Sequence, residues 1–191
     1  MASSTDHNTE NRQLDSTASN KLFLGFLVLI IIAVTWLGVI NYKEALKVED
    51  AKRNGEAWIA WLTETGTTRF EADSKHAACK GGAKAAADAK AGDPGTWGAC
   101  LAYILAETEL KDQINTFFNK PPHFVAACDP KDRTLMGAIL LEDLMPTPPG
   151  SATPFVASQL LETDSIDYKM QLRLSVCDKG GYAIKVAEFE F

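Results

Sequence analysis

An uninterrupted apolar run from Leu22 to Ile40, LFLGFLVLIIIAVTWLGVI, is the feature that most restricts what this chain can fold into. It holds no charged residue, and a helix of this length spans a hydrocarbon core of about 30 Å. Lys21 flanks the run on one side, and Tyr42 and Lys43 flank it on the other. Aromatic rings are enriched at membrane interfaces, so Trp36 and Tyr42 fit the end of a span. The run predicts one transmembrane helix.

Membrane lipid is the expected partner of this helix, and the candidate anchor residues are Leu22, Phe26, Ile30, Trp36 and Ile40. A cleaved signal peptide is one alternative. Its apolar region is shorter, about 7–15 residues, and ends in a small-residue cleavage site that Gly38-Val39-Ile40 does not supply. A buried core helix is the other alternative, but a helix this apolar would need a much larger protein around it.

Four cysteines follow the run, all on the same side of it: Cys79, Cys100, Cys128 and Cys177. An even number on one side predicts two disulfides, with three possible connectivities. The first two cysteines lie in an expected helical half and the last two at ends of expected strands, which favours Cys79–Cys100 and Cys128–Cys177. A zinc site that also uses His76 and His123 is the alternative. It lacks a CxxC pair, so we predict no metal site.

The two rules that bear on orientation disagree. The basic residues near the run are Arg12 and Lys21 before it, and Lys43, Lys47, Lys52 and Arg53 after it. Counted literally, they place the C-terminal domain in the cytoplasm. Long domains translocate largely regardless of charge, however, and disulfides need an oxidising compartment. We therefore expect a single-pass protein of the cell membrane with an extracytoplasmic, periplasmic C-terminal domain.

The chain divides by composition into four parts. Residues 1–21 are polar and are expected to form a disordered tail, and residues 22–40 form the span. Residues 41–64 carry apolar side chains at helical spacing and predict a membrane-proximal helix, which could bend or break at Asn54-Gly55. Residues 65–191 are long enough for one domain with its own core.

Within this domain, helical patterns precede strand patterns. A surface helix is expected at Ala83–Lys90, and Thr96 is placed to cap a helix that begins at Trp97. Alternating residues predict a strand at Tyr168–Cys177, a hairpin turn, and a return strand whose slip in alternation predicts a bulge near Ala187. The expected class is α+β, with a transmembrane helix, a helical half and a C-terminal antiparallel sheet.

The sequence offers little that indicates catalysis. It contains no G-x-S-x-G, P-loop, HExxH or GxGxxG motif, so we predict neither an enzyme nor a cofactor. The net charge of −6, with no basic run, argues against nucleic-acid binding. We expect other membrane or envelope proteins as partners, with the extracytoplasmic domain acting as a binding or structural subunit of an envelope assembly.

Gly25-Phe26, followed by the apolar LVLIIIAV, resembles the cleavage site and hydrophobic start of type IV pilin-like proteins. The order of an apolar helix, an amphipathic helix and an antiparallel sheet with a late cysteine is also similar. The glutamate that this family carries five residues after the cleavage point is Ile30 here. The resemblance implies an alternative function, a pilin-like (pseudopilin) filament subunit processed after Gly25.

Overall fold

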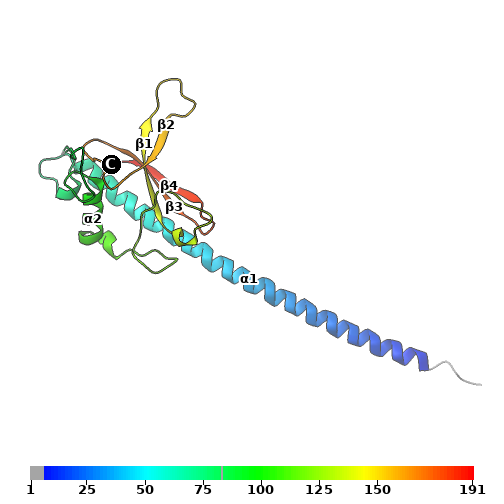
Figure 1. Ribbon diagram of the computed structural model, residues 1–191. Coiled ribbons are helices and arrows are strands. Elements are labelled where there is room, and N and C mark those ends of the chain that lie inside the picture. The colour runs from blue at the N-terminus through cyan, green and yellow to red at the C-terminus, as the bar shows by residue number, and fades with distance from the viewer. Residues whose placement is uncertain (1–6, 83) are drawn as a thin grey trace, which may run out of the picture. The chain divides into compact units, whose positions relative to one another are not determined.

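The computed structural model describes the backbone of residues 7–82 and 84–191 and the side chains of residues 20–82 and 84–191. Its helices and strands are labelled in Figure 1. The longest element is helix α1, His7–Thr68. The chain divides into two units, Met1–Ala45 and Leu46–Phe191.

The first unit is helical from His7 onward, which differs from the disordered tail expected over residues 1–21. Residues 7–21 belong to α1, and residues 1–6 lie outside the described residues. Starting a helix is costly, but extending an existing one adds a hydrogen bond for each residue fixed. The helix of the apolar run therefore extends into a polar segment whose composition alone favours disorder.

In the second unit, α1 buries one stripe of side chains against the domain. Its members recur three, four or seven residues apart and are at most 5% exposed: Ala51, Trp58, Leu62 and Thr65, with Arg69 just beyond the helix. This is the spacing of one face of an α-helix. The membrane-proximal helix predicted over residues 41–64 is present and runs on to Thr68.

The break considered at Asn54-Gly55 is absent, because the glycines of this segment permit close packing instead of forming a turn. A Cβ on Gly55 would lie 3.0 Å from Cδ2 of Leu174, and one on Gly66 would lie 2.8 Å from Cα of Phe191. The sheet therefore approaches the helix more closely than a side chain at either position would allow.

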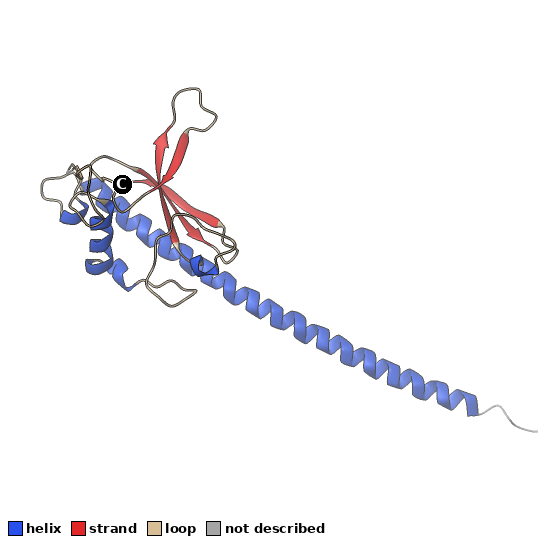
Figure 2. Cartoon of the chain, viewed as in Figure 1, coloured by secondary structure: helices blue, strands red, loops and turns tan. Residues whose placement is uncertain are grey.

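The helical half contains less helix than expected. Helix α2, Trp97–Glu107, begins as predicted, with the hydroxyl of Thr96 accepting a hydrogen bond from the Ala99 amide. Three short 3-10 helices accompany it: η1 (Ala77–Cys79), η2 (Glu109–Asp112) and η3 (Arg133–Leu135). The surface helix predicted at Ala83–Lys90 is wrong for the described residues, because 84–90 form turns and irregular structure (Figure 2). That segment has few large apolar side chains to bury, and short helices without packing are marginal in water.

Four antiparallel strands follow: β1 (Ile139–Pro146), β2 (Phe155–Gln159), β3 (Gln171–Cys177) and β4 (Ala183–Glu190), in the order β2-β1-β3-β4. Leu174 pairs with Ala187 and Ser175 with Lys185, which leaves Val186 as the extra residue of a bulge. The bulge predicted near Ala187 is therefore confirmed. The α+β class is confirmed as well, although β3 begins three residues later than predicted and Tyr168 is exposed.

Candidate functional site

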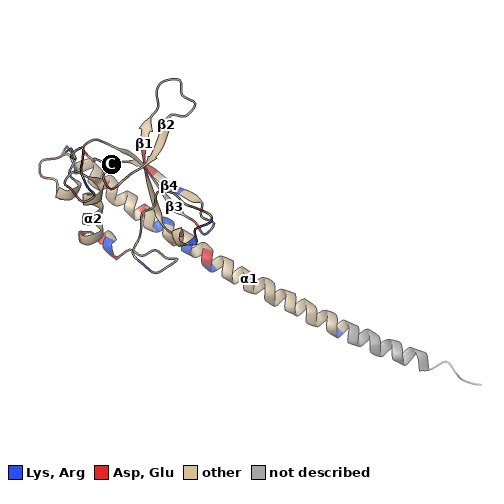
Figure 3. Ribbon diagram, in the orientation of Figure 1, with Lys and Arg blue, Asp and Glu red and all other residues tan. Residues whose placement is uncertain are grey.

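The candidate anchor lies in the first unit, where the apolar side chains of α1 are exposed on every side. The exposed fractions of the five predicted anchor residues are 77% for Leu22, 62% for Phe26, 44% for Ile30, 69% for Trp36 and 42% for Ile40. No Lys, Arg, Asp or Glu interrupts the segment between Lys21 and Lys43 (Figure 3). Soluble monomers rarely expose an apolar surface this extended. Among the described residues, α1 is the one helix long and apolar enough to cross a membrane.

A polar group inside the candidate span is satisfied without water. The hydroxyl of Thr35 donates a hydrogen bond of 2.7 Å to the carbonyl of Ile31, four residues earlier. The helix itself pairs the backbone amides and carbonyls of the segment. Both features suit hydrocarbon, where each unpaired polar group costs several kcal/mol. Lipid contact by the five anchor residues stays a prediction that this surface favours.

The two predicted disulfides are confirmed. Cys79 in η1 is bridged to Cys100 in α2, with 4.5 Å between their Cα atoms. Cys128 is bridged to Cys177 at the end of β3, with 5.5 Å between their Cα atoms. These bonds use all four sulfurs that the zinc alternative required. Among the described residues, no group of three or more His, Cys, Asp or Glu side chains is placed to hold a metal ion.

Arg69 is the buried cation of the domain. Its side chain follows α1 and donates hydrogen bonds to three backbone oxygens, those of Ile166, Tyr168 and Phe191. The guanidinium carbon also lies 4.2 Å from the ring centroid of Phe191 and 4.6 Å from that of Phe70. Burial lowers the pKa of Arg69 to about 10, and the nearby Asp167 and Tyr168 oppose this shift. Arg69 therefore ties the end of α1 to the segment before β3 and to the end of β4.

Sequence reasoning missed Arg69, although a signal for it existed. The buried stripe of Trp58, Leu62 and Thr65 predicts that position 69 also faces the core, since it lies four residues after Thr65. Arginine is rarely buried at a core position. Where it is, its guanidinium needs hydrogen-bond acceptors, so an arginine at this position predicts nearby backbone carbonyls that it can donate to.

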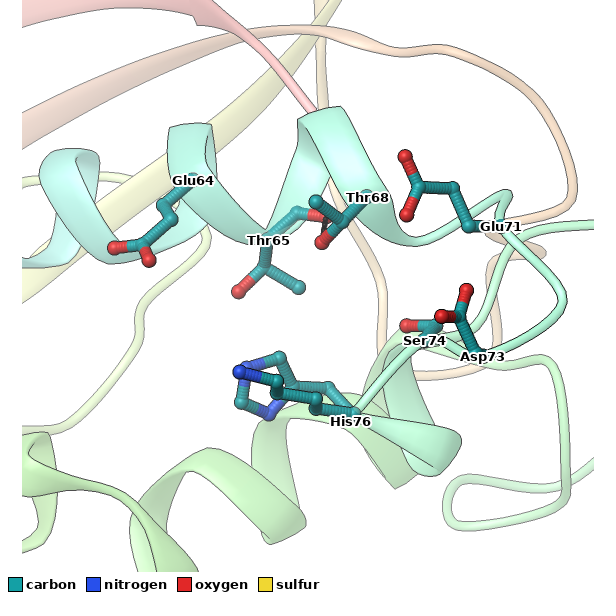
Figure 4. Close-up of a pocket in the computed structure, with 8 residues that line it drawn as sticks. Glu64, Thr65, Thr68, Glu71, Asp73, Ser74 and His76 are labelled. Atoms are coloured by element: carbon teal, nitrogen blue, oxygen red, sulfur yellow. Dashed lines mark hydrogen bonds between the residues drawn. The ribbon is translucent and has the colours of Figure 1, made fainter.

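A small pocket opens between the end of α1 and η1. Its volume is about 170 Å³, and its lining comprises Glu64, Thr65, Thr68, Glu71, Asp73, Ser74, Lys75 and His76 (Figure 4). The His76 ring lies against Trp61 at 5.0 Å between ring centroids and bonds through Nδ1 to the Tyr103 hydroxyl at 3.1 Å. These contacts fix His76 as part of the packing between α1 and α2. The rest of the lining offers carboxylates, hydroxyls and one lysine.

Tyr168, in the segment before β3, and Asp143, in β1, form a polar pair. The Tyr168 hydroxyl donates a hydrogen bond of 2.8 Å to the carboxylate of Asp143 in β1, which is buried. Partial burial, and then the hydrogen bond to Asp143, raise the pKa of Tyr168 to about 12. The Tyr168 phenol, which would be protonated at neutral pH even at its ordinary pKa, thus links the segment before β3 to β1 through Asp143.

The comparisons with known proteins give no relative: no family model matches the chain, and no curated protein or solved structure matches it.

Proposed function

We propose that this chain is a single-pass membrane protein whose periplasmic α+β domain serves as a binding or structural subunit of an envelope assembly. The observation that carries the proposal is that one helix, α1, contains both an apolar segment of membrane-spanning length and part of the core of the domain. Its apolar segment exposes every side chain from Leu22 to Ile40, and its later turns supply the buried stripe of the domain. Such a chain keeps a folded domain at a membrane and leaves the domain surface available for partners.

Both disulfides support the proposed side of the membrane. They close loops whose cysteines are 21 and 49 residues apart, and each lies within the second unit. Structural disulfides form and persist in the periplasm and outside the cell, and are rare in the cytosol. An extracytoplasmic domain is therefore the arrangement in which all four cysteines have a stable role.

A pilin-like filament subunit is the second candidate, and the domain architecture favours it. The later turns of α1 pack on a four-stranded antiparallel sheet, and the late Cys177 is bridged back to Cys128. This layout is the second feature, beside Gly25-Phe26 and the apolar run that follows, on which the resemblance to type IV pilin-like proteins rests. In this version of the proposal, cleavage after Gly25 leaves an apolar helix that packs with those of neighbouring subunits.

The orientation predicts how the cysteines react in living cells. After an acid quench and denaturation, alkylation with a maleimide-linked polymer should give no mass shift without reductant and a shift for four thiols after reduction. A matched chain that starts at Leu46 and stays in the cytosol should be alkylated without reductant. Four reactive thiols in the full chain would place its domain in the cytoplasm and contradict the proposal.

Sequencing the N-terminus of the mature protein separates the two candidates. An anchor that is not processed begins at Met1 or Ala2, whereas a pilin-like subunit begins at Phe26. We expect Gly25→Leu to have no effect on the mature mass in the first case and to block maturation in the second. A terminus between Ile40 and Leu46 would contradict both candidates, because the apolar segment would then be a removed signal.

A further inference from the structure

We propose that one end of the second unit rests on the lipid surface of the membrane. This surface, which we call the basal surface, comprises Lys47, Ile114, Phe118, Lys120 and Tyr182. The inference rests on the proposed function, because it requires that residues 22–40 span the bilayer. It adds a second membrane contact, made by loops of the domain rather than by the helix.

The chain between the span and the domain is short. Leu46, where the second unit begins, is six residues beyond Ile40. Even fully extended, six residues reach no more than about 20 Å. Whatever its orientation, the domain must therefore keep its Leu46 end close to the interface in which the span ends.

A loop lies at that end of the domain. Residues 113–120 run beside the helix, where the Asn54 side-chain amide donates to the Ile114 carbonyl and the Thr116 hydroxyl donates to the Lys47 carbonyl, both at 2.9 Å. The Lys47 ammonium lies 5.9 Å from the centre of the Phe117 ring. The tip of the loop is thus fixed to the first turns of α1 in this unit.

Hydrogen bonds hold the tip in one conformation, and two apolar side chains project from it. The buried Asn115 accepts a hydrogen bond from the Phe117 amide and donates one to the Met136 carbonyl. Its backbone pairs with Lys120. This framework holds Phe118 38% exposed and Ile114 45% exposed. Because the loop is already ordered in the folded domain, inserting these side chains into a lipid interface costs little further conformational entropy.

The β3–β4 turn lies at the same end. Gly66 lies against Phe191, whereas Gly55 lies against Leu174 and Val176, so β3 runs toward the Leu46 end as it approaches Cys177. The turn that follows is closed by Asp178, whose carboxylate accepts from the amides of Gly180 and Tyr182. It leaves Tyr182 65% exposed. Aromatic side chains with a polar tip are enriched at membrane interfaces.

The charges at this end suit a lipid surface. Lys47 and Lys120 are exposed beside the apolar tip. Of the acidic residues of α1 near Lys47, Glu49 pairs with Lys52 and Asp50 pairs with Arg53, and Glu44 lies three residues before Lys47. Lysines that flank apolar side chains place their ammonium groups among lipid phosphates, particularly those of anionic lipids.

Photo-crosslinking in the full chain tests the inference. The protein is reconstituted in vesicles of phosphatidylcholine and phosphatidylglycerol with p-benzoylphenylalanine replacing Phe118 or, separately, Ile114. Matched positions are Trp36 in the span and Phe155, a similarly exposed aromatic residue of β2 at 44% exposure. We expect positions 118 and 114 to give several-fold more lipid adduct than position 155, and Trp36 to give lipid adduct as well.

The pattern of adducts separates the inference from the proposed function. Lipid adduct at position 36, with none at 118 and 114 beyond the level at 155, overturns the basal surface and leaves the anchor intact. Crosslinks at 118 and 114 to a second copy, in place of lipid, also overturn it. No lipid adduct at position 36 overturns the proposed function itself. Correct disulfide pairing of each variant, checked by mass mapping, shows that it has folded.

Discussion

Replacing Arg69 with methionine is expected to destabilise the domain by about 3 kcal/mol, since it leaves the carbonyls of Ile166 and Tyr168 without their donor. The Phe191 carbonyl loses one of its two donors and keeps the Met170 amide at 2.7 Å. Each such group costs about 1–3 kcal/mol when its partner is removed. The gain from no longer burying a charge offsets part of the sum. Methionine fills much of the same volume, so the effect reports the lost hydrogen bonds more than a cavity.

Denaturant unfolding of the full chain in detergent, followed by tryptophan fluorescence, measures this effect. Two variants control for charge and geometry. Arg69→Lys keeps a cation but cannot present the planar fork of donors, so it should be destabilised nearly as much. Arg53→Met removes an exposed arginine whose nearest partner is Asp50 at 3.5 Å, and should change stability by no more than about 0.5 kcal/mol. Equal shifts for the Arg69 and Arg53 methionine variants would contradict the assigned role.

Features with a strong local signal could be predicted from the sequence. The apolar run, the capped helix α2 and the bulge in β4 each follow from one stretch of residues read against a fixed period. Gly55 shows where this reasoning fails. Locally, Asn54-Gly55 is a turn signal, but a strand far along the chain packs against that glycine and the helix passes through. The reason for the glycine lies in Leu174 and Val186, which no local pattern connects to it.

The same distinction applies to the candidate site. The cysteine pairs could be predicted because the sequence assigns their partners to segments of like character, helical with helical and strand with strand. The expected strand before Cys128 is absent, however, and that segment is irregular apart from an isolated bridge at Phe124. The basal surface could not, since Ile114 and Tyr182 are 68 positions apart and only the fold brings their loops to one end of the domain. The surface helix predicted at Ala83–Lys90 was wrong because good intrinsic helix propensity does not replace a buried face.

Removal of the Cys128–Cys177 bridge, by changing both residues to alanine, is the second large effect that we expect. The bridge closes a loop of about 50 residues, and the chain-entropy relation gives a loss of about 4 kcal/mol for that length. The bridge also holds residues 123–139 at the end of β3, where the amide of Gly137 donates to the carbonyl of Cys177. The loss should appear in denaturant unfolding of the full chain in detergent.

The other disulfide provides the matched comparison. Removing Cys79–Cys100 in the same way opens a loop of about 22 residues and should cost about 3 kcal/mol. If unfolded-chain entropy dominates, the double alanine variant at positions 128 and 177 is the less stable of the two. The reverse order would contradict this account. It would mean that the Cys79–Cys100 bridge stabilises the folded state by more than its loop length predicts. The added stability would come from holding the poorly packed segment before α2 against that helix.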